Sequence, residues 1–478
     1  MLNFWDYNVW SWILLFGALL GSLLVGNILK KSIPFLQESL IPTSVIGGTI
    51  LLIVSAIYKW ITGDVMFDTE IFAGHGMQTL EVVTYHTLSL GFIASSFKTT
   101  GSKLTKKRSS EILNTGVTTV ATYLLQGIFG LGITMIAAMI VAGFFPAAGV
   151  LLPFGYGQGT GQALNYGNIY EVDFGFVGGR SFGLTIAALG FLVASLGGVL
   201  HLNIVKKRGK LVKSERTDGS LHSEQIESQY EIPMQESIDK MTVQIALIIV
   251  AYVATYLIMY AIGSLLPGLR SVIYGFNFLL GVLSATLIKL LLNFLRRKKI
   301  VKKKYTNNFL MTRISNFFFD IMVVAGIAAI RLDILQNYWG ILLILGIIGA
   351  IVTYIYNYCI AKTLFPDYHE EQFLTMYGML TGTASTGIIL LREIDRDFKT
   401  PASDNMVYQN FPAIVLGFPI MFLATLAPVR PVLTLVIFIV FFAVLNIVLF
   451  RDKLFKSKKA QSSEDDDKVI MDMYEDEE

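Results

Sequence analysis

Two short polar stretches interrupt an otherwise apolar chain, and each combines glycine with hydroxyl or amide side chains. The first is GYGQGTGQALN, residues 155–165, in which four glycines alternate with other residues. The second is TGTASTG, residues 381–387. A helix that breaks at such a stretch leaves backbone N–H groups free where one half begins and carbonyl oxygens free where the other half ends. The N–H groups suit a carboxylate, whereas carbonyl and hydroxyl oxygens suit a hard cation such as sodium.

Each stretch also has a purely structural interpretation. Glycines in membrane helices most often allow close packing, and Ser and Thr hydroxyls often bond back to a carbonyl of their own helix. Alternating glycines, however, do not form a single small-residue face, and the neighbouring side chains of Gln158, Thr160, Gln162 and Asn165 need partners. We therefore favour a binding role for both stretches.

The composition is that of an integral membrane protein. Of 478 residues, 54% are hydrophobic and only 15% are charged, and the mean hydropathy is +0.60. Apolar runs long enough to cross about 30 Å of hydrocarbon recur along the chain, and a helix satisfies its own backbone there. The predicted fold class is therefore an all-α integral membrane protein in contact with the lipid bilayer. The net charge of +3 argues against a nucleic-acid partner.

Few residues could bind a metal cofactor or form a disulfide. A single cysteine, Cys359, excludes an internal disulfide, and the five histidines fall in no metal-ligand spacing. We expect no cofactor other than a coupling ion.

The apolar runs predict the helices that would position the two polar stretches. In the first half the predicted spans are about 10–29, 41–62, 78–97, 112–142 and 176–205. In the second half they are about 242–266, 271–295, 312–332 and 339–361, followed by an apolar block, 407–450, that is long enough for two spans.

Basic loops orient these spans. Positive charges between Lys98 and Arg108 and in RRKKIVKKK, residues 296–304, predict cytoplasmic loops, so the N-terminus is expected outside and the C-terminus inside. The basic segment 206–210 is also cytoplasmic only if the preceding polar stretch enters and leaves the membrane on the same face. We therefore predict a re-entrant hairpin at about 146–172, which enters from outside.

A second hairpin is predicted at about 372–395. Its flanks contain Lys362, Arg392, Arg396 and Lys399, so both of its ends are expected on the cytoplasmic side. The alternative is a true span, because the segment is long enough to cross the membrane if its glycines are tolerated.

Together these elements predict an inverted repeat, an arrangement common in secondary transporters, which bind substrate and ions at discontinuous helices near the midplane. Each half has five transmembrane helices and a hairpin, and one extra helix ends the second half. The predicted parts are a first repeat (1–205), a cytoplasmic linker (206–240), a second repeat (241–450) and an acidic cytoplasmic tail (451–478).

Candidate site residues follow from the two breaks. Those expected to bind substrate are Gly157, Gln158, Gly159, Thr160, Gly161, Thr381, Gly382, Thr383, Ser385, Thr386 and Arg392. Those expected to bind sodium are Thr160, Asn165, Thr383, Ser385 and Asp320.

Two of these candidates are charged, and each has an alternative. A carboxylate within an apolar span is a functional candidate, but Asp320 could instead pair with Arg313. Arg392, like Arg180, could bind a substrate carboxylate or simply extend to the membrane interface.

Four segments resemble the bacterial glutamate:sodium symporter family. They are GYGQGTG (155–161), YGMLTGTAST (377–386), IPTSVIGGTILL (41–52) and GFIASSFK (91–98). The resemblance covers roughly residues 10–205 and 240–450. It implies sodium-coupled uptake of glutamate by an inverted-repeat carrier. The chain departs from the family at Tyr156 and Gln158, where members tend to have Gly and His, and in the LLREIDRD segment after the second stretch.

The leading hypothesis is a sodium-coupled symporter that imports glutamate or a similar small dicarboxylate by alternating access. The alternative is a proton- or sodium-coupled carrier of another organic anion, similar to the 2-hydroxycarboxylate carriers. An enzyme is not expected, because the chain contains no HExxH, no nucleophile elbow and no paired metal carboxylates within its spans. The expected location is the cytoplasmic membrane of a bacterium, and a homodimer is possible.

Overall fold

The computed structural model describes residues 3–98, 106–207, 238–395 and 400–451, and every regular element in these ranges is a helix. The first half contains α1 (Tyr7–Ser32), α2 (Pro34–Glu38), α3 (Thr43–Thr62), α4 (Gly76–Ser96), α5 (Lys106–Ile140), α6 (Leu151–Val172) and α7 (Gly179–Lys207). The second half contains α9 (Lys240–Leu265), α10 (Arg270–Gly275), α11 (Asn277–Arg297), α12 (Asn308–Ala328), α13 (Trp339–Leu364), α14 (His369–Thr381), α15 (Ala384–Arg392), α16 (Ala402–Tyr408), α17 (Asn410–Leu426) and α18 (Pro431–Leu449). Most of the predicted linker (206–240) and tail (451–478), namely residues 208–237 and 452–478, lies outside the described residues.

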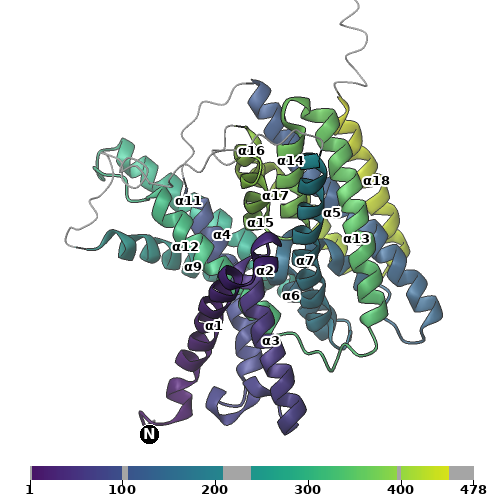
Figure 1. Ribbon diagram of the computed structural model, residues 1–478. Helices are drawn as coiled ribbons and strands as arrows, with labels where there is room; N and C mark the ends of the chain where they lie inside the picture. Colours follow the sequence, from purple (N-terminus) through teal and green to yellow (C-terminus); the bar gives the residue numbers. More distant parts are fainter. Residues whose placement is uncertain (1–2, 99–105, 208–237, 396–399, 452–478) are drawn as a thin grey trace, which may run out of the picture.

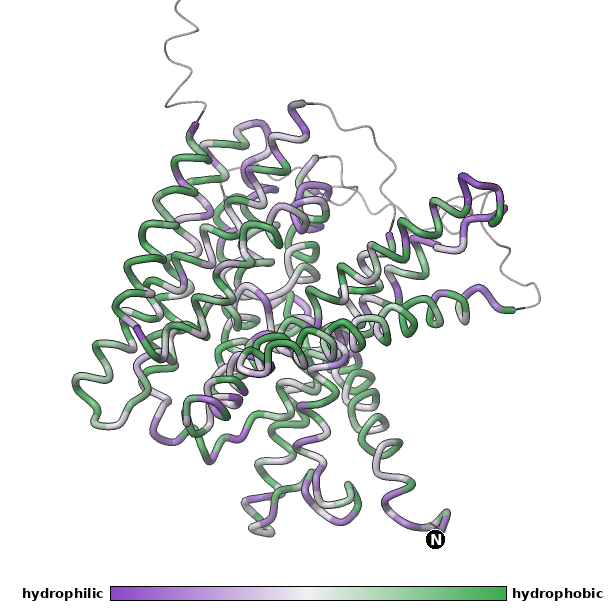
Figure 2. Tube along the Cα trace, turned by 180° about the vertical axis from the view of Figure 1, so that it is seen from behind, coloured by the Kyte–Doolittle hydropathy of each residue, from purple (hydrophilic) through white to green (hydrophobic). Residues whose placement is uncertain are grey.

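Most of these helices are suited to a membrane. Within the described ranges, nine are long and apolar enough to cross one: α1, α3, α5, α7, α9, α11, α12, α13 and α18. The pair α16 and α17, bent by 51°, makes a tenth if it is counted as one span. Figure 2 shows that hydrophilic residues gather mainly at the helix ends and in the loops. The predicted all-α membrane fold is confirmed.

Helix α4 occupies the predicted span 78–97 but is not among the nine, because it contains many polar residues. It packs against α6, α11 and α12. Several of its polar side chains, including those of Thr84, Thr87 and Ser89, are buried within the protein. Contact with neighbouring helices thus replaces contact with lipid along this face.

The packing of the two halves follows one pattern. The contact between α1 and α3 corresponds to the contact between α9 and α11. In the same way, the contact between α3 and α12 corresponds to the contact between α11 and α4. Helix α7 packs on α13 as α17 packs on α5, while α5 and α13 pack on each other. In Figure 1, α5, α13 and α18 lie side by side, and α9 and α11 project to the other side of the molecule.

Candidate functional site

Helix α6 folds back on itself at Gly159, within the residues for which a hairpin is predicted. Gly159 has φ +79° and ψ −171°, a conformation outside the helical region. The rings of Phe154 and Tyr166 stack with their centroids 3.9 Å apart. In a straight helix, residues twelve positions apart would be separated by about 18 Å. We call the two arms, residues 151–158 and 160–172, together with their turn, hairpin 1.

The alternating glycines of hairpin 1 have different roles. Gly159 allows the turn, because a positive φ is unfavourable for residues with a side chain. Gly157 allows close packing, since a Cβ there would lie 2.1 Å from the ring of Tyr123. Gly161 does the same against Leu88, whose side chain would be 2.7 Å from an added Cβ.

Helices α14 and α15 form the second reversal of the chain, hairpin 2, with its break at Gly382 and Thr383. A Cβ on Gly378 would lie 2.8 Å from the Cα of Gly387, so the two arms are in backbone contact. Thr383 is the N-cap of α15, and its hydroxyl accepts a hydrogen bond of 3.4 Å from the N–H of Thr386. The two arms therefore pack against each other instead of forming one straight helix, and a re-entrant position in the membrane stays a prediction.

Hairpin 1 packs along one half of α5. Near the C-terminal end of α5, the hydroxyl of Thr134 accepts a hydrogen bond of 3.0 Å from the N–H of Gly149, at the base of the hairpin. Further toward the middle, the Tyr123 hydroxyl donates a 3.1 Å hydrogen bond to the carbonyl of Gly157, near the tip.

Hairpin 2 packs along the other half of α5. The Nε2 of Gln126 donates a 2.9 Å hydrogen bond to the carbonyl of Leu380, near the tip. The Nε2 of Gln372, in the first arm, donates to the hydroxyl of Thr115 at 3.2 Å. The hairpins therefore approach from opposite ends of α5, and their tips overlap beside residues 123–126. The α5 segment between Thr115 and Thr134 is about 28 Å long, comparable to the membrane core.

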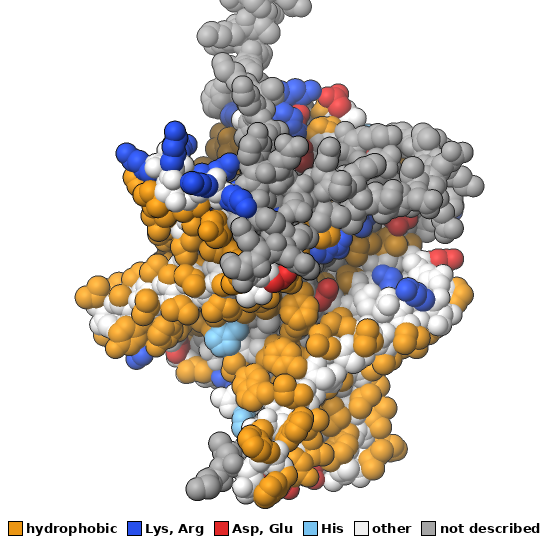
Figure 3. Space-filling view, turned by 90° about the vertical axis from the view of Figure 1, so that its left-hand side faces the viewer, with side chains coloured by type: hydrophobic (Ala, Val, Ile, Leu, Met, Phe, Trp, Pro, Cys, Tyr) orange, Lys and Arg blue, Asp and Glu red, His pale blue; other side chains and the backbone are white. Residues whose placement is uncertain are grey.

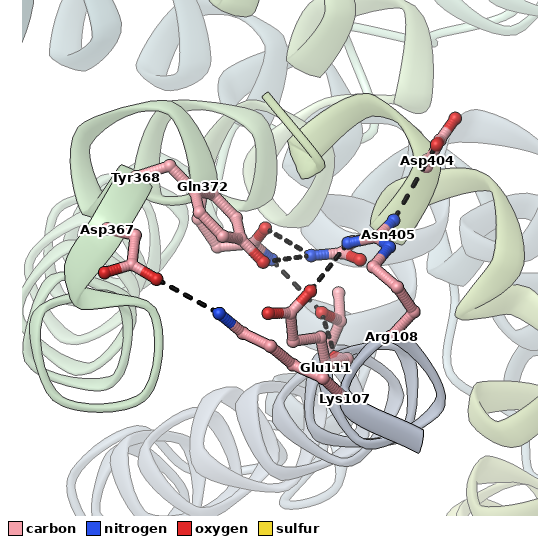
Figure 4. A network of polar contacts seen from close by, with 9 residues as sticks. Lys107, Arg108, Glu111, Asp367, Tyr368, Gln372, Asp404 and Asn405 are labelled. Carbon is pink, nitrogen blue, oxygen red and sulfur yellow. Dashed lines mark hydrogen bonds and ion pairs between the residues drawn. The ribbon is translucent and has the colours of Figure 1, made fainter. Parts of the chain in front are cut away.

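A polar network joins the base of hairpin 2 to α5 and α16 (Figure 4). Asn405 donates hydrogen bonds to the hydroxyl of Tyr368 at 2.9 Å and to Oε1 of Gln372 at 3.1 Å. Arg108 pairs with Glu111 at 2.6 Å within α5. The same guanidinium lies 3.7 Å from Asp404 of α16, and Lys107 lies 3.3 Å from Asp367, which precedes α14. These contacts link three segments that are far apart in the sequence.

A cavity of about 190 Å³ lies between the hairpin tips. Both hairpins line it, through Gly157, Gln158 and Gln162 on one side and Gly382, Thr383 and Ala384 on the other. Residues of α4, α5, α11, α12, α14 and α17 complete the wall, together with Gln409 between α16 and α17. The volume lies below the range of about 300–1,000 Å³ that is usual for drug-sized ligands, so the cavity suits a small solute.

The lining residues contain no Asp, Glu, Lys, Arg or His within the described part of the chain. Their polar groups are amides, hydroxyls and backbone atoms. Gln162 is only 1% exposed, and neither its Nε2 nor its Oε1 has a hydrogen-bond partner among the described residues. An unpaired buried amide costs roughly 1–3 kcal/mol, so a ligand that pairs with it would gain stabilisation.

The predicted substrate residues of hairpin 1 divide into cavity and structural positions. Gly157 and Gln158 line the cavity. Gly159 forms the turn, and Gly161 packs against Leu88. The buried hydroxyl of Thr160 donates a 3.3 Å hydrogen bond to the carbonyl of Met322 in α12.

The candidates of hairpin 2 divide in the same way. Gly382 and Thr383 line the cavity. The Thr381 hydroxyl donates to the carbonyl of Tyr377 at 2.6 Å, which is bonding back within its own helix, and the Thr386 hydroxyl is 3.4 Å from that of Thr383. Arg392 is exposed at the C-terminal end of α15 and is not part of the cavity wall. The side chain of Ser385 lies outside the described residues.

The structure does not gather the predicted sodium ligands into one group. Of the four with described side chains, only Thr383 lines the cavity. Asn165 donates a 3.3 Å hydrogen bond to the carbonyl of Gly275, near α11. Asp320 neighbours Ser44 of α3, and Arg313 lies 5.1 Å from the ring of Phe309 rather than in an ion pair with Asp320.

Arg180 has structural partners at the base of hairpin 1. Its guanidinium lies 3.3 Å from Glu81 of α4 and 3.9 Å from Glu171, and its Nε donates to Asn168 at 2.9 Å. Sequence reasoning expected Arg180 at the membrane interface or beside a substrate. The structure instead shows a partly buried cluster of charges that joins α4, α6 and α7.

Sequence reasoning did not single out several residues of the cavity wall. Tyr123 comes from a different helix, α5, and Gln409 from the junction of α16 and α17. Gln162 is recognisable as a polar residue in the first stretch, but no local pattern distinguishes it from Gln158 or Asn165. Only the three-dimensional packing shows which amide lacks a partner.

A family model described as "Sodium/glutamate symporter" matches residues 13–398 of the chain. No curated protein matches the chain at a significant level. The matched region contains both hairpins and most of the cavity wall.

Proposed function

The chain belongs to the sodium/glutamate symporter family, and from this premise we propose that it imports glutamate together with sodium by alternating access. The observation that carries this proposal is the meeting of two half-helix starts at one cavity. The second arm of hairpin 1 begins at Thr160, and α15 begins at Ala384. Both starts belong to the hairpin tips that border the cavity.

The free N–H groups and the positive end of the helix dipole at these two starts favour negatively charged groups. A dicarboxylate has one such group for each start. The absence of basic side chains from the described cavity wall makes these backbone groups the strongest attraction that it offers an anion.

Sodium would be bound by the carbonyl and hydroxyl oxygens near the two breaks. The first arm of hairpin 1 and α14 both end there, and a helix end leaves carbonyl oxygens without intrahelical partners. Thr383 is the described hydroxyl that lies closest to this role, because it lines the cavity and is the N-cap of α15, at the break that follows α14.

Alternating access follows from an inverted repeat, which we propose on two observations. The hairpins approach the cavity from opposite ends of α5. The contact of α1 with α3 recurs between α9 and α11, and the contacts that join the two halves also occur in corresponding pairs. Such symmetry provides two structures of similar stability, one open to each side of the membrane.

We place the N-terminus outside and the cytoplasmic face at the end where α11 finishes in Arg296 and Arg297 and where Lys107 and Arg108 begin α5. Figure 3 shows one flank of the molecule, largely covered by hydrophobic side chains, with Lys and Arg side chains gathered mainly towards the top. This distribution suits a bilayer around the middle of the protein. The bacterial cytoplasmic membrane is the proposed location.

The test is uptake of labelled L-glutamate into proteoliposomes that contain the purified protein. We expect saturable accumulation that requires an inward sodium gradient and stops when a sodium ionophore removes it. Equal uptake in potassium buffer without any ion gradient would reject sodium coupling, and flux that only equilibrates the label would indicate a channel.

A further inference from the structure

The two buried amides of the cavity wall have hydrogen-bonding atoms without partners. Gln162 and Gln409 are each 1% exposed and both line the cavity. Within the described residues, neither side-chain atom of Gln162 has a partner, and the Oε1 of Gln409 accepts no hydrogen bond. The Nε2 of Gln409 is used, since it donates to Sδ of Met379 and Oδ1 of Asn410.

Other buried amides with an unpaired atom do not share this position. Gln126, Asn277, Asn357 and Asn405 each have one unpaired oxygen and, like Gln409, donate hydrogen bonds through the side-chain nitrogen. None of these four lines the cavity. Among the described residues, Gln162 and Gln409 are therefore the buried amides that both have an unpaired acceptor and belong to the cavity wall.

We propose that Gln162 and Gln409 recognise the ammonium group of an amino dicarboxylate, so that the cavity selects a 2-amino acid over its 2-oxo and 2-hydroxy counterparts. This inference rests on the proposed function and specifies which chemical group its substrate must have.

The free oxygens of the two amides suit a ligand group that donates hydrogen bonds. An ammonium group has three N–H donors, and the Oε1 atoms of Gln162 and Gln409 are acceptors without donors. A 2-oxo acid offers no donor at this position, and a 2-hydroxy acid offers one. Buried acceptors left without a donor weaken binding, so both analogues would be disfavoured.

The position of Gln162 fits the rest of an amino-acid head group. Gln162 lies in the first turn of the second arm, which starts at Thr160, so it is next to the free N–H groups of that arm. The α-carboxylate and the ammonium group of an amino acid are attached to one carbon. The same turn can therefore donate to the carboxylate through its backbone N–H groups, while Oε1 of Gln162 accepts from the ammonium group.

The experiment compares Gln162→Met and Gln409→Met with the matched control Gln126→Met. Gln126 is also fully buried and also contacts hairpin 2, but its amide donates to Thr353 and Leu380, and the residue is not part of the cavity wall. For each protein, sodium-dependent thermal stabilisation would be titrated with L-glutamate, 2-oxoglutarate, 2-hydroxyglutarate and glutarate, which has no substituent at carbon 2.

The wild-type protein should bind glutamate at least tenfold more tightly than the other three ligands. Gln162→Met should weaken glutamate binding by about 10- to 100-fold and change glutarate binding by less than about threefold, so that selectivity is lost. Gln409→Met should act in the same direction. Gln126→Met should lower thermal stability and change the affinities for all four ligands by the same factor.

Several outcomes would overturn the inference. One is an unchanged ratio of glutamate to glutarate affinity in both cavity variants. Another is that Gln162→Met loses glutamate binding and that saturating sodium restores the binding. That result would make this amide a sodium ligand. If the wild-type protein binds none of the four ligands in sodium, the proposed function fails instead, and the two failures are thereby distinguished.

Discussion

Gly159, at the turn of hairpin 1, and Thr383, at the break of hairpin 2, meet beside the cavity: a Cβ on Gly159 would lie 3.7 Å from Cγ2 of Thr383. This is an ordinary van der Waals distance, so the two tips touch without leaving Gly159 sterically confined. The requirement for glycine here comes from the backbone conformation and not from lack of space.

Replacing Gly159 tests this requirement. Gly159→Ala should destabilise the hairpin tip by about 1–3 kcal/mol, because φ +79° with ψ −171° is a region used almost only by glycine. Gly159→Val should abolish glutamate uptake while the protein is still inserted in the membrane. Uptake in proteoliposomes and thermal unfolding in detergent measure the two effects. Wild-type uptake by Gly159→Val would show that the turn is not needed for transport.

Substitution of Gly157 should reduce glutamate uptake for a steric reason, so a second substitution that makes room should restore it. Gly157→Ala places a methyl group against the ring of Tyr123, which occupies that space. We expect the loss of uptake to be partly restored by adding Tyr123→Leu, since the smaller side chain makes room. The same Tyr123 change should not restore Gly159→Ala. Rescue of both glycine variants, or of neither, would contradict the distinct roles assigned to them.

The sodium role of Thr383 can be tested against a neighbouring hydroxyl. Thr383→Val should raise the sodium concentration for half-maximal uptake by about tenfold or more, whereas Thr383→Ser should stay near wild type. Thr381→Val is the control, because that hydroxyl is already bonded to the carbonyl of Tyr377. Equal sodium dependence in Thr383→Val and Thr381→Val would remove Thr383 from the proposed sodium site.

Arg180 should affect stability more than substrate binding. Removing it in Arg180→Gln leaves Glu81 and Glu171 without their shared cation, and we expect a loss of about 1–3 kcal/mol in unfolding free energy. Adding Glu81→Gln should recover part of this loss. Glutamate affinity should change by less than about threefold. A large loss of affinity at unchanged stability would instead assign Arg180 to the substrate.

The orientation of the two hairpins can be tested with single cysteines. Cys359 is the one cysteine of the chain, so Cys359→Ser gives a cysteine-free background. Val177→Cys, beyond the base of hairpin 1, should react with an impermeant maleimide in intact cells. Glu393→Cys, at the end of hairpin 2, should react only after the membrane is opened. Both side-chain positions are exposed in the structure. Labelling of both from outside would reject the inverted arrangement.

Much of the fold could be predicted because hydropathy and glycine content are local signals. The apolar runs coincide with the helices, and the stretch around Gly159 coincides with the reversal in α6. Near α15 the same signal was ambiguous, and only the contact between Gly378 and Gly387 distinguishes two packed arms from one straight helix.

The candidate site was less predictable because it depends on which polar groups find partners. Thr160 and Thr381 are in the expected stretches, yet their hydroxyls donate to backbone carbonyls. Gln162 has the same local surroundings and finds no partner. Tyr123 and Gln409 reach the cavity from distant parts of the chain, so no local pattern could indicate them.

The uncharged wall of the cavity has a consequence for energy coupling. An anion that enters a site without basic side chains loses its hydration and gains only the partial positive charges of the two helix starts, which do not compensate in full. A cation bound nearby offsets that loss, and by thermodynamic reciprocity the anion increases the affinity for the cation by the same factor. Neither ion is then stable in the site alone, so the cavity disfavours the partly loaded states through which a gradient would be dissipated.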